Sequence, residues 1–442
     1  MQTALNKAVK NRLVRLTQLA GVRQEELRPL CWCGVYIFCV LSAYYVIRPV
    51  RDAFGSANGA EDLQWLFSAT LIAMLVCNLP FAALSRRLSR QRAITLFYRF
   101  FIACLLLFAL LISVLNAPGR LWLGRVFFVW VSVFNLYVVS IFWMLIVDIF
   151  DSDRGKRLFA LMAAGATLGA IAGSLFTITL VKVAGPAGLF LLAAVLLELA
   201  VCCVRRLTHL APQLRHPSRR VDENDGRPLG GGILSGIGHT FRSPYLLNIC
   251  LYMILFSVTS TFLYFRQAEL ARHAFSNDGA RSTFFASLDL LVNVLTLTVQ
   301  ILATGQLLSR FGTTAVLIIL PVLTVVGFLA LAWQPSLLAL ALFSVVRRAS
   351  NFAIARPTRE LLFTVLNRED KYKAKSFIDT AVYRAGDQVG AWSWTAAGML
   401  GSSGPVWLWL AVPLSVFWLL NSLWLGQRQQ RLASAPQANA PR

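Results

Sequence analysis

Charged residues are scarce in this chain, and acidic residues are the scarcer kind. Only 14% of the 442 residues are charged and 57% are hydrophobic, whereas about a quarter of the residues in an average soluble domain are charged. Lys and Arg together number 42 against 20 for Asp and Glu, so the formal net charge is +22. This composition excludes an ordinary soluble domain and indicates a protein that crosses a membrane several times.

Signatures of enzymes and of metal sites are also missing. The sequence has no G-x-x-x-x-G-K-[ST] phosphate loop, which argues against ATP hydrolysis as a driving force. The four histidines lie in predicted loops without the spacing of metal ligands, and no Ser or Cys has the surroundings of a nucleophile. Eight cysteines lie in or beside apolar segments, and Cys31-x-Cys33 lacks a second pair. We therefore expect no enzymatic activity, no metal and no cofactor.

The excess of basic residues does not point to nucleic acid. Basic residues alternate with apolar segments and form no continuous face, and orientation in a lipid bilayer explains them more simply. The first 28 residues are basic but contain no apolar core. We expect them to form a cytoplasmic extension and not a cleaved signal peptide.

Twelve apolar segments are long enough to cross a membrane as helices, since about 20 residues span a hydrocarbon core of roughly 30 Å. Basic residues gather in the loops after the even-numbered segments, so the positive-inside rule places both termini and the central loop in the cytoplasm. Exceptions follow the first segment (Arg48 and Arg51) and the seventh (Arg266, Arg272 and Arg281). The segments are 29–47, 63–84, 93–115, 121–146, 158–183, 187–204, 245–265, 283–307, 314–333, 336–355, 377–400 and 406–425.

The chain divides into two related halves. We expect an extension at 1–28, a six-helix bundle at 29–204, a cytoplasmic linker at 205–242, a second six-helix bundle at 243–426 and a cytoplasmic tail at 427–442. Gly165-x-x-x-Gly169 recurs as Gly386-x-x-x-Gly390 after a shift of 221 residues, and we expect these glycines to permit close helix packing. The predicted fold is an all-α membrane protein with twelve transmembrane helices in two six-helix pseudo-repeats, major facilitator-like, with substrate bound near the midplane between the halves.

Two adjacent arginines lie deep in the tenth segment. Arg347 is eleven residues beyond Ser336, about 16 Å along a helix, and Arg348 follows it. Such residues inside a membrane mark functional sites by default. They are candidates for binding an anion through bidentate guanidinium contacts. The alternative is a structural ion pair with Asp289 or Asp387.

The eleventh segment carries a polar stripe. Lys375, Asp379, Tyr383 and Asp387 follow one another at i+4, and Arg384 is placed to pair with Asp387. The stripe lines either a cavity or the contact between the halves. Asp289, in the eighth segment, is either a partner for Arg347 or Arg348, or a proton carrier or gate.

Three sequence blocks carry a resemblance to a known family. Ile47 to Asp52 reads I-R-P-V-R-D. Phe142 to Asp148 reads F-W-M-L-I-V-D and is followed by G-K-R-L-F. Pro357 to Glu360 reads P-T-R-E and is followed by K-Y-K-A-K at 371–375 and by Asp379.

Together these blocks resemble the ATP/ADP translocase family. The sequence departs from that family's pattern at Arg51, where the family has Lys, at 145–147, where it has Phe-Ala-Asn, and at Ala374, where it has Gly. The resemblance implies twelve spans and counter-exchange of nucleotides without hydrolysis. It maps the family's charged positions to Arg51, Asp148 and one lysine among Lys371, Lys373 and Lys375.

We therefore predict a monomeric secondary transporter of a bacterial inner membrane that exchanges phosphorylated anions, with ATP and ADP as the leading pair. The alternatives are a proton-coupled facilitator that uses Asp289 or Asp387, and a membrane scaffold without transport. The predicted substrate-binding residues are Arg51, Arg347, Arg348, Asp379, Tyr383, Arg384 and Asp387. The predicted gate or coupling residues are Arg48, Asp52, Asp148, Lys156, Asp289, Arg359, Glu360, Lys371, Lys373 and Lys375.

Overall fold

The computed structural model describes residues 27–57, 59–87, 90–149, 152–214, 243–366, 374–375, 377–399 and 406–434. Within these ranges the chain is almost entirely helical and contains no strand. The predicted cytoplasmic extension and most of the predicted linker lie outside the described residues, as does the end of the tail from residue 435.

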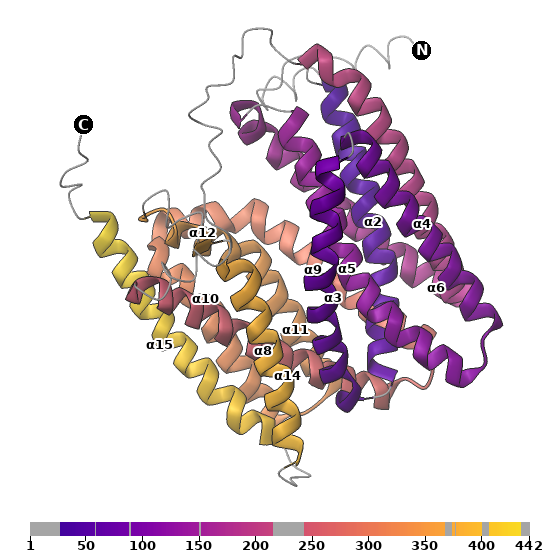
Figure 1. Cartoon of the computed structure of the whole chain (residues 1–442). Helices are drawn as coiled ribbons and strands as arrows, with labels where there is room; N and C mark the ends of the chain where they lie inside the picture. Colours follow the sequence, from indigo (N-terminus) through magenta and orange to yellow (C-terminus); the bar gives the residue numbers. More distant parts are fainter. Residues whose placement is uncertain are drawn as a thin grey trace, which may run out of the picture. The chain divides into compact units, whose positions relative to one another are not determined.

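Two compact units make up the chain. The described part of the first unit runs up to Arg51 and continues from Ile72 to Leu214. It contains most of α2 (Leu27–Ala57), the second half of α3 (Ala60–Arg87), α4 (Arg90–Val114), α5 (Ala117–Ile149) and α6 (Ser152–Leu214), drawn from indigo to magenta in Figure 1. The segment Asp52–Leu71 belongs to the second unit, which the division of the sequence into halves did not suggest.

The described part of the second unit contains ten further helical elements, three of which are π-helical turns marked η. Ser243, Asn277 and Ser336 cap α8, α9 and α11 by accepting a hydrogen bond from a backbone N–H of the first turn. The elements are α8 (Pro244–Ala274), α9 (Asp278–Val299), η1 (Gln300–Thr304), α10 (Gly305–Trp333), α11 (Leu337–Ser350), η2 (Asn351–Ala355), α12 (Arg356–Leu362), η3 (Ile378–Val382), α14 (Tyr383–Met399) and α15 (Val406–Ser434).

Two glycines break long helices between predicted membrane segments. Gly185 in α6 has φ 61° and Gly312 in α10 has φ 71°, a left-handed conformation that glycine adopts without steric strain. Eight described helices are long and apolar enough to span a membrane. Two of these eight contain a break, α6 and the run α9–η1–α10, and each covers two predicted segments. The two remaining predicted segments are α3 and η3–α14. Counted in this way, the described helices correspond one for one to the predicted segments. The number of membrane crossings itself remains a prediction.

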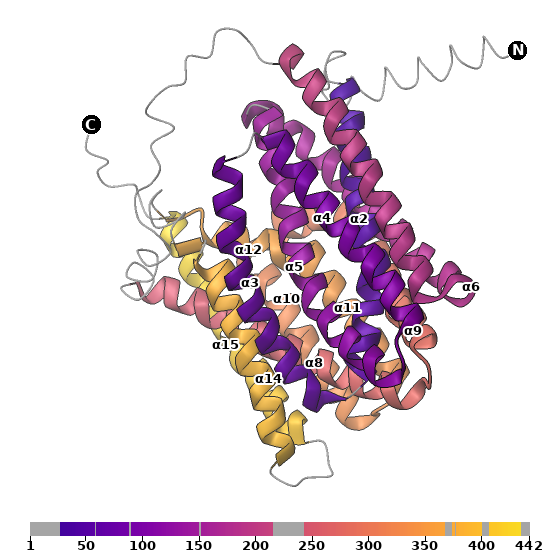
Figure 2. The same ribbon diagram turned by 45° about the vertical axis from the view of Figure 1, so that its right-hand side comes forward.

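Helix α8 lies at the centre of the second unit and packs against α14 and α15, as Figures 1 and 2 both show. Trp418, Tyr252 and Phe256 are buried together in this core. On α14, a Cβ atom added to Gly386 would lie 2.7 Å from the Cβ of Ser257 on α8. Only glycine permits this close approach of the two helices.

The repeated glycine pattern has the same function in both units. In the first unit, a Cβ atom at Gly169 on α6 would lie 2.5 Å from the carbonyl oxygen of Phe38 on α2. In the second unit, one at Gly390 on α14 would lie 2.9 Å from the Cβ of Thr261 on α8. The predicted packing function of the glycines is therefore confirmed. The fifth segment of each predicted half packs through glycine against the first.

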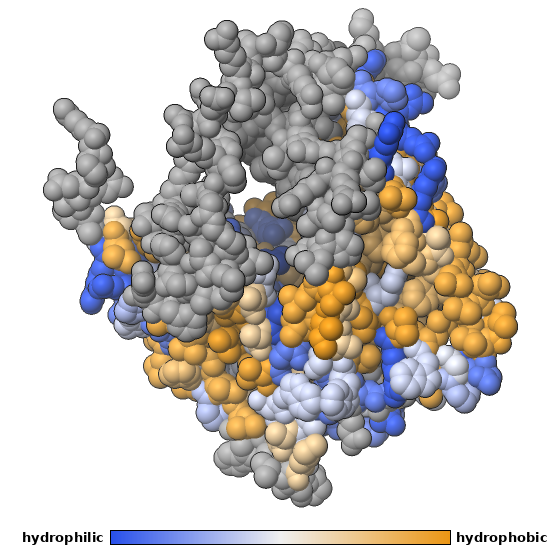
Figure 3. All heavy atoms as spheres, viewed as in Figure 1, coloured by the Kyte–Doolittle hydropathy of each residue, from blue (hydrophilic) through white to orange (hydrophobic). Residues whose placement is uncertain are grey.

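Apolar side chains cover wide areas of the exposed surface. Figure 3 shows them in orange on the face in view, and Leu110, Leu302 and Trp333 are among the large hydrophobic residues that are more than half exposed. Outward-facing apolar side chains are expected of helices that contact lipid.

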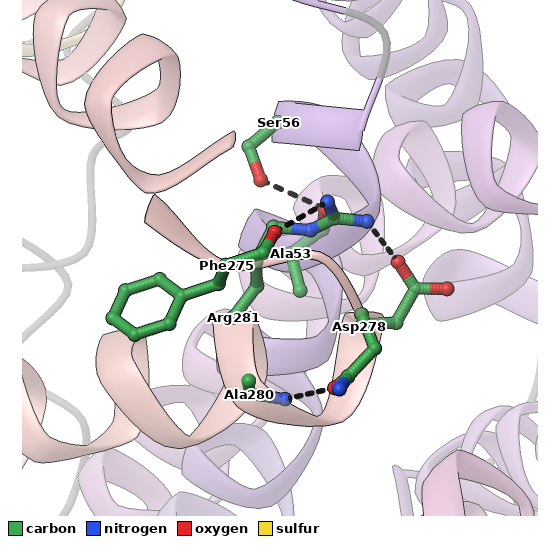
Figure 4. Close-up of polar contacts among 7 residues, drawn as sticks. Ala53, Ser56, Phe275, Asp278, Ala280 and Arg281 are labelled. Carbon is green, nitrogen blue, oxygen red and sulfur yellow. Dashed lines mark hydrogen bonds and ion pairs between the residues drawn. The ribbon is translucent and has the colours of Figure 1, made fainter. Parts of the chain in front are cut away.

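Two of the basic residues that departed from the positive-inside pattern have acidic partners, and Figure 4 shows the first of them, Arg281. The guanidinium group of Arg281 donates a hydrogen bond to the carbonyl oxygen of Phe275, 3.3 Å away, and forms an ion pair with Asp278. Arg266 similarly pairs with Glu269 at 2.9 Å. Each of these two arginines therefore has an acidic partner three residues away in the chain.

Candidate functional site

Arg347 lies in the interior of the second unit and is only 3% exposed. Its Nε donates to the hydroxyl of Thr324 at 3.1 Å, and its two terminal nitrogens donate to the hydroxyls of Ser260 and Thr259, each at 2.9 Å. The carbonyl oxygen of Phe256 accepts a further bond at 3.3 Å, and the Phe256 ring lies 5.3 Å from the guanidinium carbon. Neutral hydroxyls and an aromatic ring thus replace the carboxylate that a buried arginine usually has as its partner.

Its neighbour Arg348 has a carboxylate partner. A terminal nitrogen of Arg348 lies 2.5 Å from Oδ1 of Asp289 on α9. The Asp289 side chain is 2% exposed and the Arg348 side chain 22% exposed. Successive residues of a helix differ in direction by about 100°, so one arginine faces α8 and the other faces α9.

A second ion pair is formed within α14. Arg384 lies 3.2 Å from Oδ2 of Asp387, as its spacing predicted. The hydroxyl of Ser257 on α8 forms a hydrogen bond with Oδ1 of Asp387. Between these charges and the core, Tyr383 stacks obliquely on Phe256 with its ring centre 6.3 Å away.

Two further ion pairs connect α12 with the chain that leads into η3. Arg359 lies 3.7 Å from Oδ1 of Asp379. Lys375 forms an ion pair with Glu360, and its ammonium group lies 6.0 Å from the ring centre of Phe363.

The polar stripe predicted along the eleventh segment is divided. That prediction assumed a continuous α-helix, whereas the π turn η3 interrupts the i+4 spacing between Asp379 and Tyr383. Asp379 consequently pairs with Arg359 of α12, and Asp387 pairs with Arg384 and Ser257.

The four ion pairs leave a surplus of positive charge. They contain all four carboxylates of the network, which are Asp289, Glu360, Asp379 and Asp387. Two more arginines belong to the same helices. Within the part of the chain that the structure describes, Arg347 has only neutral partners and Arg356 contacts only the ring of Phe352, 5.4 Å from its guanidinium carbon. The network therefore has six basic side chains and four acidic ones.

Three predicted site residues at the end of α2, Arg48, Arg51 and Asp52, are far in sequence from the residues of this network. In the first unit, Arg51 lies over the ring of Phe128 at 4.7 Å, and Arg48 over the ring of Tyr45 at 5.6 Å. In the second unit, the buried Asp52 accepts a hydrogen bond of 3.0 Å from the hydroxyl of Tyr264.

Four predicted gate residues cannot be placed in a site. Lys371 and Lys373 lie outside the described residues, and Asp148 and Lys156 lie in α5 and α6 at positions where only the backbone is described. The hydroxyl residues around Arg347, in contrast, were not predicted. Their signal in the sequence is the run Ser257-Val-Thr259-Ser260 inside an otherwise apolar segment.

Comparisons with known proteins agree with this fold. The sequence profile of the Major Facilitator Superfamily matches residues 30–358. A solved peptide transporter of the POT family, in an auto-inhibited state, superposes with a TM-score of 0.61 at 15% identity, covering 94% of this chain and 99% of that one. A POT family transporter in complex with 5-aminolevulinic acid superposes with a TM-score of 0.63 at 11% identity, over 92% and 97% of the two chains.

The proteins of similar sequence are more narrowly defined than this superfamily. ADP,ATP carrier protein 1 of Chlamydia pneumoniae is 22% identical over 95% of this chain and 96% of its own length. The chloroplastic ADP,ATP carrier protein 1 of Arabidopsis thaliana is 21% identical over 93% of this chain and 77% of its own. These matches confirm the predicted fold class and the resemblance seen in the three sequence blocks. The chain belongs to the major facilitator superfamily and is similar, over nearly its whole length, to ADP,ATP carrier proteins.

Proposed function

We propose that this protein is a secondary transporter of a bacterial inner membrane that exchanges phosphorylated anions by alternating access, with ATP and ADP as the leading pair. The observation that carries the proposal is the surplus of basic side chains in the ion-pair network of the second unit. The similarity to ADP,ATP carrier proteins supports nucleotides as the substrates.

The surplus favours an anion because every carboxylate of the network already has a basic partner. Arg356 is exposed and forms no ion pair of its own among the described residues, so it offers a first contact for phosphate. Arg348 and Arg384 are partly exposed, and within the described ranges each is paired with one carboxylate. Phosphate oxygens match the planar fork of a guanidinium group as well as a carboxylate does. A bound phosphate group can therefore replace Asp289 or Asp387 as the partner.

Arg347 has a different function in this proposal. Four hydrogen bonds fix its orientation, and its low exposure keeps it from direct contact with a solute. Its charge still acts at a distance, because an arginine with neutral partners produces a positive potential that an adjacent carboxylate would cancel. We propose that Arg347 raises the affinity of the site for anions without touching them.

The pairs Lys375–Glu360 and Arg359–Asp379 form the proposed cytoplasmic gate. Both connect α12 to residues that follow 367–373 in the sequence, namely Lys375 and Asp379, and both are partly exposed. Lys375–Glu360 is the more exposed pair, and exposed ion pairs contribute about 0–1 kcal/mol, so it can break and re-form at little cost. Arg359–Asp379 is more buried and costs more to break. A phosphate group bound nearby would compensate the basic partners while the gate is open. An empty carrier has no such compensation, and this favours exchange over leak.

Ligand-dependent thermal stability of the purified protein tests this proposal. Because a ligand that binds only the folded state raises apparent stability, ATP and ADP should raise the unfolding temperature and adenosine should not. Arg348→Gln should abolish the increase. Equal stabilisation by adenosine would show that the phosphates are not recognised, and no stabilisation by any phosphorylated metabolite would contradict the anion site.

A proton-coupled facilitator is the second candidate. The observation that favours it is the deeply buried carboxylate of Asp289 beside a partly exposed arginine. This candidate predicts solute uptake driven by an imposed pH gradient and lost in Asp289→Asn. Exchange driven only by nucleotide on the opposite side, and insensitive to the gradient, would exclude it.

A further inference from the structure

A π turn separates the two arginines of the tenth predicted segment from the charges that follow that segment. Arg347 and Arg348 precede η2, and Arg359 and Glu360 follow it. The backbone N–H of Arg356 donates to the carbonyl oxygen of Asn351, five residues earlier, which is the hydrogen bond of a π-helix. The turn therefore contains one residue more than a regular α-helix would.

This extra residue determines which way Arg359 points. In a continuous α-helix Arg359 would lie in line with Arg348, since eleven residues at about 100° each bring the direction back to within about 20°. With one residue absorbed by the π turn, Arg359 lies in line with Arg347 instead. The contacts agree, because Arg347 donates to Thr259 and Ser260 of α8, and Arg359 contacts Met253 of the same helix.

Pro357 lies two residues after the end of the turn and removes one backbone donor from it. Proline has no backbone N–H, so it leaves one carbonyl group of the preceding turn without a helical donor. In α-helical spacing this is the carbonyl of Ala353, and in π-helical spacing it is the carbonyl of Phe352. An unsatisfied carbonyl is costly in a membrane, where no water can replace the donor.

Two side chains from η1 donate to these two carbonyl groups. The hydroxyl of Thr304 donates to the carbonyl oxygen of Ala353 at 2.9 Å, and the side-chain amide of Gln300 donates to that of Phe352 at 3.4 Å. The flanking Ile301 and Leu302 are largely exposed apolar residues, as expected of a surface that contacts lipid. A glutamine at such a surface is unfavourable unless its polar atoms are bonded.

We propose that Thr304 and Gln300 are positioning residues for transport. They satisfy the two carbonyls that Pro357 can leave without a donor, and so they hold η2 in the register that turns Arg359 toward α8. Neither residue touches the charged network. This inference rests on the proposed function, because it assigns the positioned arginine to the gate of a transporter.

A double-mutant cycle tests the inference. Thr304→Val removes the donor with almost no change of shape, and Thr304→Ser retains it. We expect Thr304→Val to lower the maximal rate of nucleotide exchange in proteoliposomes by about five- to tenfold with little change in KM, as the loss of one partly buried hydrogen bond would do. Thr304→Ser should stay within about twofold of the original rate.

The second arm uses Pro357→Ala, which restores the backbone N–H. If Thr304 acts on the carbonyl that Pro357 leaves without a donor, Thr304→Val should lower the unfolding temperature of the original protein clearly and that of the Pro357→Ala protein little or not at all. Equal effects in both backgrounds, or full exchange activity of Thr304→Val, would overturn the inference. The thermal arm does not depend on transport, so an original protein that fails to exchange nucleotides would refute the proposed function alone.

Discussion

Asp289→Asn should strengthen nucleotide binding while it destabilises the folded protein. In the structure Asp289 holds Arg348 through an ion pair of 2.5 Å, and in the proposed mechanism a phosphate group must displace this carboxylate. Asparagine retains an acceptor oxygen but not the charge. The substitution therefore removes the competitor of the substrate and leaves the arginine in place.

The expected size follows from the contact. A hydrogen bond to a charged group contributes about 1.5–3 kcal/mol, and because the Arg348 side chain is 22% exposed we take the lower end. About 1.4 kcal/mol corresponds to a tenfold change in Kd, so ADP should bind roughly tenfold more tightly. Without ligand, the unfolding free energy should fall by about 1–2 kcal/mol.

Isothermal titration of ADP into the purified variant, together with denaturant unfolding, measures both quantities. Arg348→Gln is the matched control, since it breaks the same ion pair from the other side. It should abolish ADP binding and destabilise more strongly, by about 3–5 kcal/mol, because it leaves a buried carboxylate without its arginine. The reasoning is refuted if Asp289→Asn weakens ADP binding as much as Arg348→Gln does.

Three other substitutions probe the remaining parts of the structure. Gly386→Val should destabilise the protein by more than about 2 kcal/mol in denaturant unfolding, because a Cβ atom there would lie 2.7 Å from the Cβ of Ser257. An unchanged midpoint of the unfolding transition would contradict the close packing of α14 on α8. Arg347→Met should weaken ADP binding several-fold although the arginine makes no contact with the ligand, and unchanged affinity would remove its proposed electrostatic effect. Glu360→Lys alone should raise nucleotide leak in the absence of counter-substrate, whereas Glu360→Lys with Lys375→Glu should restore coupled exchange; a double variant that leaks like the single one would argue against a gate at this pair.

Much of the fold was predictable because membrane insertion imposes its pattern on the sequence. Apolar segments of about 20 residues and the repeated glycine spacing identified the helices and how they pack. The pair Arg384–Asp387 was predictable as well, because residues three apart on a helix are neighbours whatever the surroundings.

The partners of the two adjacent arginines were not predictable. Arg347 and Arg348 are adjacent residues of the same type, and only the directions of the neighbouring helices decide that one faces the hydroxyls of α8 and the other faces Asp289. Sequence spacing gives the angle between two side chains on one helix but not the identity of the facing helix.

The π turns were missed for a related reason. Periodicity arguments assume a uniform 100° per residue, and a single inserted residue shifts every later prediction, as it did for the stripe from Lys375 to Asp387. Pro357 was the visible signal for η2, whereas the donors Thr304 and Gln300 lie on another helix about 50 residues away.

The flux of labelled ATP into proteoliposomes, with and without ADP inside, tests the central claim most directly. The account predicts rapid uptake into ADP-loaded vesicles, little uptake into empty vesicles and no dependence on an imposed pH gradient. Uptake that is equal in loaded and empty vesicles, or that follows the pH gradient and not the internal nucleotide, would contradict exchange of phosphorylated anions.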